Sequence, residues 1–263
     1  MSICFFKIFI YFLQSNKKQP RINLLTYFDR YGIIRKNKKD VIFLRNKSKA
    51  SFWLPFYVVV TIIGFALILI IPQSREVFKG LSSGHPYIMG FIKFALLATA
   101  GELIASSIRA GKANVPVKIV ARFVIWGLIG VWITFMMKVF SSAAASLMAQ
   151  GIIPGKDNAF LRAFYTSVFM NTSFGPTFMA FHKCTDQWLL LKHQKEDSSL
   201  PSVINSIDWT GFVSFTIFKT VPIFWIPAHT VTFMLPGQYQ VMMAAALSLV
   251  LGLILSLSSK KAK

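Results

Sequence analysis

Acidic residues and cysteines are scarce in this chain. Only nine of its 263 residues are Asp or Glu, against 29 Lys and Arg, and 14% of the residues are charged. A soluble domain ordinarily carries about 25% charged residues, so this composition argues against one. The two cysteines, Cys4 and Cys184, are too few for a disulfide framework or a zinc cage, and we expect plain thiols and no metal site.

Sequence motifs of the common enzyme classes are also missing. The chain has no His-Glu-x-x-His, no Gly-x-Ser-x-Gly and no phosphate-binding glycine-rich loop with lysine. With so few acids, several of them in expected loops, paired carboxylates for acid–base chemistry are not evident. We therefore predict no catalytic residues, no cofactor and no enzymatic activity.

Apolar residues are abundant in this sequence. They make up 54% of the chain, and the mean hydropathy is +0.56. Several runs approach the roughly 20 apolar residues that a transmembrane helix needs. The sequence thus predicts an all-α, multi-pass transmembrane helical bundle with six spans, at Phe52–Ile71, Ile88–Ile108, Ile119–Phe140, Ala163–Phe181, Trp209–Leu235 and Gln238–Leu257.

The basic residues are distributed unevenly around these runs. Twelve of the 29 lie in the first 50 positions. If the N-terminus faces the cytoplasm-like side, six spans place 22 basic residues on that side, four on the other and three within spans. The rule that positive charge stays inside favours this topology. Five spans remain an alternative, in which Trp209–Leu235 only dips into the membrane and the C-terminus lies on the opposite side.

The net charge of +20 indicates an anionic partner. Because the charge lies in tails and short loops between apolar runs, we expect the lipid bilayer and its anionic headgroups to be that partner. Nucleic acid is not expected, although a basic patch is also its electrostatic footprint. A second copy of the chain is a further candidate partner.

The chain divides into four regions. Residues 1–50 form a basic tail, 51–79 the first span and its loop, 80–258 the main helical domain, and 259–263 a basic end. Within the tail, Ile3–Leu13 is apolar but too short to span a bilayer. A targeting segment, an interfacial helix and a start codon assigned too early remain open for it, and we favour a non-essential, lipid-facing or disordered tail over cleaved targeting.

Glu102 is the most informative polar residue within a predicted span. A carboxylate at mid-membrane costs a few kcal/mol, so it should face the bundle interior or water and have a partner. Arg109 lies about two helical turns further on, and Lys219 or His229 on other helices are alternative partners. A pore-lining carboxylate and a structural ion pair are equally compatible with the sequence.

Other polar residues in the spans have weaker assignments. Asn171, Lys219 and His229 join Glu102 as candidates for a pore or polar interior, with interhelical hydrogen bonding as the simpler interpretation of Asn171 and His229. Lys93, Arg122 and Lys138 are interpreted as residues near span ends whose charged groups reach the membrane surface. Helix kinks are expected at Pro176, Pro222, Pro227 and Pro236.

Small residues mark the surfaces where helices are expected to approach closely. Gly127 and Gly130 lie in one predicted span, and small side chains recur in the preceding one, at Ala98, Ala100, Gly101, Ala105 and Ser106. Such residues let membrane helices pack with short backbone separations. We interpret them as packing residues, not as a binding site.

A series of short motifs between residues 80 and 258 resembles a known family in its order and spacing. The motifs are His85-Pro86-Tyr87, Gly101-Glu102, Lys138-Val139, Ile153-Pro154-Gly155, Trp225-Ile226-Pro227, Thr232-Phe233, Leu235-Pro236 and Leu257-Ser258. This order is similar to that of the Mpv-seventeen / peroxisomal-membrane-protein-twenty-two family, with Glu102 in place of the family's Asp. Residues before 80, including the first span, have no counterpart in it.

The resemblance carries expectations about function. It implies a small channel-like membrane protein involved in passage of small solutes or metabolites. The alternative is a non-transporting scaffold or assembly factor whose polar groups hold helices together. The resemblance also implies the mitochondrial inner or peroxisomal membrane for a eukaryotic chain, whereas a bacterial chain would lie in the plasma membrane.

Overall fold

The computed structural model describes residues 47–261, with side chains for 54–251 except residue 109. Residues 49–263 form one compact unit. Every regular element among the described residues is helical, which confirms the predicted all-α class. Most of the predicted basic tail, including Cys4 and the segment 3–13, lies outside the described residues.

Prolines set the boundaries of the first three helices. Helix α4 (Lys47–Ile70) ends before Pro72, where α5 (Pro72–Gly84) begins, and Pro86 begins α6 (Pro86–Ala110). Proline suits the first helical position because its missing N–H has no partner there in any case. Ile71 between the first two helices is extended, and the chain bends by 98° at this break. The predicted first span thus corresponds to α4, with a sharp turn at its end.

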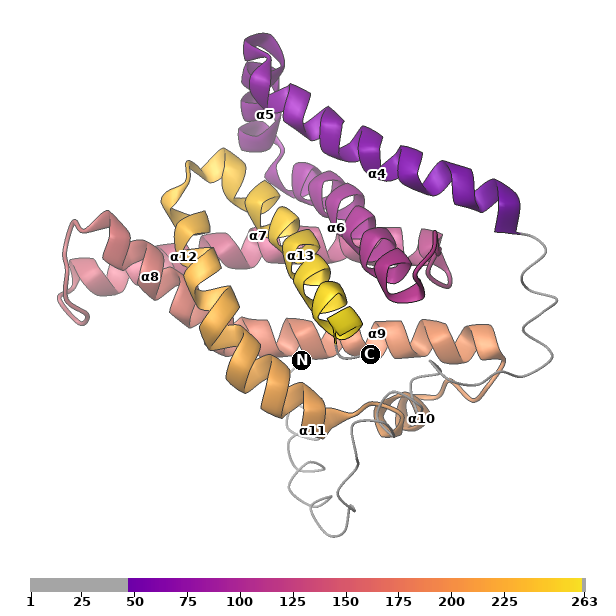
Figure 1. Ribbon diagram of the computed structural model, residues 1–263. Coiled ribbons are helices and arrows are strands. Elements are labelled where there is room, and N and C mark those ends of the chain that lie inside the picture. Colours follow the sequence, from indigo (N-terminus) through magenta and orange to yellow (C-terminus); the bar gives the residue numbers. More distant parts are fainter. Residues whose placement is uncertain (1–46, 262–263) are drawn as a thin grey trace, which may run out of the picture. The chain divides into compact units, whose positions relative to one another are not determined.

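Helix α6 packs against two long helices, α7 (Ile119–Ala149) and α13 (Gly237–Lys261) (Figure 1). The approach to α7 is so close that a Cβ on Gly130 would lie 2.3 Å from the Gly90 carbonyl oxygen. On the other side, a Cβ on Gly101 would lie 3.0 Å from Cα of Leu249. The packing role predicted for Gly101 and Gly130 is therefore confirmed, and Gly90 is their unpredicted counterpart.

The next helical stretch is longer than the predicted span Ala163–Phe181. It runs from α8 (Ala159–Phe169) through the π-helical segment η2 (Met170–Phe174) into α9 (Gly175–Gln194). In η2 the N–H of Gly175 bonds the carbonyl of Met170, five residues back. This wider turn accommodates Pro176, whose ring would clash with a carbonyl in a regular helix.

After the short helix α10 (Leu200–Asn205), the chain forms one continuous helical stretch with a second wide segment. It comprises α11 (Trp209–Gly211), the π-helical η3 (Phe212–Trp225) and α12 (Ile226–Met234). Pro222 lies inside η3 and Pro227 in the first turn of α12. Leu235-Pro236 then separates α12 from α13. All four prolines predicted to mark kinks thus lie at a π-helical segment, a helix start or a break.

Three helices among the described residues are long and apolar enough to cross a membrane: Pro86–Ile108, Ile119–Ala149 and Trp209–Met234. A fourth results if α4 and α5 together form one bent span, and α13 contributes a shorter apolar stretch, Gly237–Leu251. These helices are compatible with membrane insertion, as predicted. They account for three or four of the six predicted spans, so the count of six is not confirmed.

Candidate functional site

Glu102 of α6 lies against a partner that the sequence did not single out. Nη1 of Arg122, in the first turn of α7, is 2.7 Å from Oε1 of Glu102 and 2.6 Å from Oδ1 of Asp186 on α9. Nε of the same guanidinium donates to the carbonyl of Val117 at 2.9 Å. One arginine therefore connects three helices. The interpretation of Arg122 as a surface-reaching side chain was wrong, because it pairs inward with two carboxylates.

A histidine completes this group. His182 precedes Asp186 by one helical turn on α9, with Nδ1 3.5 Å from Oδ2 of the aspartate. The imidazole also packs against the Trp126 ring of α7 in a tilted arrangement, with ring centroids 4.3 Å apart. We call Glu102, Arg122, His182 and Asp186 the charged cluster.

The charged cluster is only partly open to its surroundings. The exposed side-chain fractions are 13% for Arg122, 18% for Glu102, 19% for His182 and 37% for Asp186. Oε2 of Glu102 is buried and has no hydrogen-bond partner among the described residues. Two carboxylates share one guanidinium, so the cluster carries net charge −1 when both carboxylates are ionised and His182 is neutral. A proton or another cation would restore neutrality there.

The cluster also contains a set of metal-ligand types. Glu102, His182 and Asp186 each offer one ligand atom, and these atoms lie within 4.8 Å of one another. However, the Arg122 guanidinium already contacts both carboxylates and supplies positive charge between them. The donor set therefore fits a salt-bridge network better than a metal centre.

A second polar group joins two of the predicted residues, Asn171 and His229. Nδ1 of His229 lies 3.1 Å from Oδ1 of Asn171, whose amide nitrogen donates to the Ser167 carbonyl at 2.8 Å. The Ser167 hydroxyl in turn donates to the carbonyl of Ile226 at 2.7 Å. Since an amide oxygen can only accept, this contact assigns the imidazole proton to Nδ1. The chain of bonds links α8 and η2 to α12, beside Pro227.

The three lysines that lie within predicted spans have different environments. Lys219 is exposed on η3, so the structure does not bring it to Glu102 or His229. Lys93, expected to reach the surface, is instead 2% exposed, with Nζ 2.8 Å from the Ser82 hydroxyl and 4.4 Å from the Phe78 ring centroid. Lys138 is exposed, as its interpretation requires, with Nζ 5.4 Å from the ring centroid of Tyr87.

His182 and Asp186 were missed because the predicted span ended at Phe181. The histidine and the aspartate are four residues apart, the spacing of neighbours on one helix face. That signal becomes visible only when the helix is known to continue through them, as α9 does.

Comparison with models of known protein families, with curated proteins and with solved structures found no match for this chain. The functional argument therefore depends on the geometry of the chain itself.

Proposed function

We propose that this protein is an integral membrane protein that lets small solutes pass across the membrane in a channel-like manner. The observation that supports the proposal best is the charged cluster. Glu102 and Arg122 belong to two helices apolar enough to cross a membrane, and such helices exclude ionisable residues unless these face the bundle interior or water. The unpartnered oxygen of Glu102 and the excess negative charge suit an attraction for cations.

The proposed topology has six spans with the N-terminus on the cytoplasm-like side. It adds Phe52–Ile71, Ala163–Phe181 and Gln238–Leu257 to the three helices that meet the length and hydropathy of a span. In this arrangement the charged cluster lies at the cytoplasm-like ends of α6 and α7, next to the loop that joins them. The host membrane follows from the proposed family resemblance over residues 80–258: mitochondrial inner or peroxisomal in a eukaryote, plasma membrane in a bacterium.

Conductance of the purified protein in planar bilayers tests this function. Wild-type protein should conduct, and Glu102→Gln should reduce the preference for cations over anions because it removes the negative charge nearest the proposed path. Lys219→Gln is a matched control, since it changes an exposed charge on another helix. Absence of conductance, or identical selectivity in wild type and Glu102→Gln, would contradict the role of Glu102 in passage.

A non-transporting scaffold is the second candidate, and the same cluster supports it. Arg122 ties α6 and α9 to α7, which is what a purely structural ion pair would do. The scaffold predicts that Glu102→Gln lowers the melting temperature in detergent while neither form conducts. Channel function predicts conductance in the wild type, so the two measurements together separate the candidates.

A further inference from the structure

A cavity of about 420 Å³ lies away from the charged cluster, where α7, α8 and the break between α12 and α13 meet. Its lining combines polar and apolar side chains, and it includes one charged side chain, that of the exposed Arg162 on α8. Small-molecule sites commonly measure about 300–1,000 Å³ and combine apolar walls with a few placed polar groups. The cavity has that size, and its lining offers both apolar side chains and polar groups.

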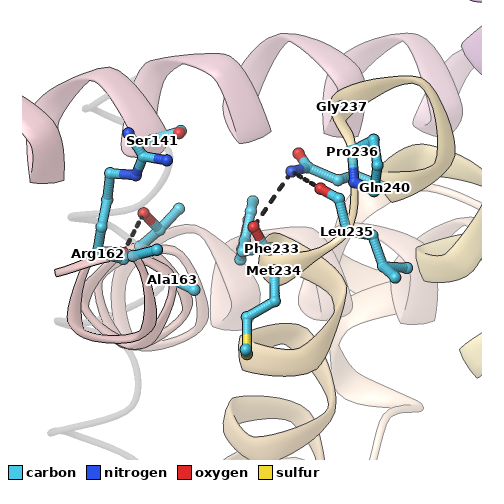
Figure 2. A pocket seen from close by; sticks show the side chains of 11 residues that line it. Ser141, Arg162, Ala163, Phe233, Met234, Leu235, Pro236, Gly237 and Gln240 are labelled. Atoms are coloured by element: carbon cyan, nitrogen blue, oxygen red, sulfur yellow. Dashed lines mark hydrogen bonds between the residues drawn. The ribbon is translucent and has the colours of Figure 1, made fainter.

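Arg162 brings its positive charge to this cavity without a carboxylate. Figure 2 shows its side chain extending from α8 toward α7 at the position of Ser141. Among the described residues, the ion pairs found do not include Arg162, and no Asp or Glu lines the cavity. A guanidinium offers five N–H donors in a planar fork that matches carboxylate and phosphate oxygens.

Gln240 lies on the other side of the cavity, and the helix break determines its orientation. Its Nε2 donates to the carbonyls of Leu235 at 2.9 Å and Phe233 at 3.3 Å, both freed where α12 ends before Pro236 (Figure 2). With both amide hydrogens committed, the oxygen of Gln240 is left to accept a hydrogen bond. Phe233 and Leu235 supply apolar surface between Gln240 and Arg162.

From this arrangement we infer that the cavity binds a small organic oxyanion, with a carboxylate or phosphate head on Arg162 and an apolar body against Phe233 and Leu235. A lone inorganic ion would leave most of the volume unfilled, since a water molecule occupies about 30 Å³. The inference goes beyond the proposed passage of solutes, because it assigns a binding site at the opposite end of α7 from the charged cluster.

Calorimetric titration of the full chain in neutral phosphatidylcholine nanodiscs tests the inference without requiring transport. The probes are benzoate and phenyl phosphate, with benzamide as the uncharged counterpart of benzoate. We expect an oxyanion to bind and benzamide to bind at least about tenfold more weakly, the effect of losing a charge-assisted pair. Equal binding of benzoate and benzamide, or no binding of either oxyanion, would overturn the site.

Three variants locate the interaction. Arg162→Gln should weaken oxyanion binding at least about tenfold, whereas Lys156→Gln, which removes an exposed charge from the preceding loop, should leave it within about twofold. Ser141→Leu keeps the arginine but places a bulky apolar side chain where the guanidinium lies, so it should also weaken binding. An equal loss of oxyanion affinity in the Arg162 and Lys156 variants would contradict an oxyanion site at Arg162. Undiminished binding by Ser141→Leu would contradict it too.

The same titration in phosphatidylglycerol nanodiscs distinguishes two sources of the oxyanion. If a lipid phosphate occupies Arg162, the affinity for benzoate should fall at least about tenfold from its value in phosphatidylcholine, in wild type and Lys156→Gln alike. If the ligand is a free solute, both proteins should show only the same small decrease in affinity for benzoate. Failure of conductance would leave this binding result intact, so the two proposals can fail separately.

Discussion

At the residue scale, the charged cluster is arranged around one arginine. Arg122 contacts Glu102 and Asp186 at salt-bridge distance, and its Nε is bonded to a backbone carbonyl. Removing one member of a buried ion pair costs more than the pair contributes, because the remaining charge keeps its desolvation penalty. The arginine should therefore be the most sensitive member of the charged cluster.

Arg122→Gln is expected to destabilise the protein by about 1–3 kcal/mol. This is below the 3–5 kcal/mol typical of a fully buried pair, because the cluster is partly exposed. Thermal unfolding in detergent, followed by tryptophan fluorescence, measures the loss. Lys112→Gln, an exposed change in the same loop region, should unfold like the wild type. Adding Glu102→Gln to Arg122→Gln should recover part of the loss, and further destabilisation by the double change would show that the two side chains do not form a pair.

The contact between Asn171 and His229 should be measurable as a coupling. A double-mutant cycle with Asn171→Ala and His229→Phe is expected to give about 0.6–1.7 kcal/mol, from the mean to the maximum measured for hydrogen bonds between membrane helices. Unfolding in detergent provides the free energies. Thr172→Ala is the control, because that hydroxyl is exposed and bonds only the Val168 carbonyl of its own helical stretch. Coupling as small for Asn171 as for Thr172 would refute the interhelical bond.

At the element scale, the contact between α6 and α7 depends on glycine. Helices α6 and α7 approach so closely that neither Gly90 nor Gly130 has room for a Cβ. The obstacle at Gly130 is the carbonyl oxygen of Gly90, which can move only if the helix moves. Overpacking of this kind typically costs about 1–3 kcal/mol.

Gly130→Ala should therefore lower the free energy of unfolding by about 1–3 kcal/mol and separate α6 from α7 locally. Gly64→Ala on α4 is the matched control, since nothing lies within 4 Å of the added methyl group. Alanine also has the higher helix propensity, so the Gly64 change should be neutral or slightly stabilising. Chemical unfolding of the two variants in the same detergent compares them directly, and an undiminished stability of Gly130→Ala would contradict the packing described.

Element boundaries were predictable where proline or a charge interrupts an apolar run, and less so elsewhere. Pro72 ended the first run correctly, and the break at Pro236 also lies where the pattern placed it. The helix through Phe181 could not be followed from hydropathy, because polar residues begin at His182 while the backbone stays helical to Gln194. Tertiary packing, such as the contact of the Trp126 ring with His182, supports a helix where apolar periodicity does not.

At the scale of the whole molecule, the uneven distribution of basic residues predicts which loops share a side of the membrane. In a background with both cysteines replaced by serine, single cysteines at Ala113 and Glu196 should react with an impermeant maleimide from the same side of sealed vesicles. A cysteine at Lys156 should react only from the opposite side. Permeabilised vesicles provide the control for accessibility, since all three positions should then react. Labelling of all three from one side would exclude the six-span topology.

The sequence by itself determined that this chain is helical and contains apolar helices compatible with a membrane, because hydropathy and proline placement act locally along the chain. It also identified Glu102, Asn171 and His229 as polar residues that require partners. Only the tertiary structure decided which partners they have: Arg122 for the first, and each other for the last two. A side chain's own helix limits which direction it can face, but which neighbouring helix meets it depends on packing of the whole bundle. The cavity around Arg162 also emerged only there, since its lining comes from segments up to about 100 residues apart in the chain.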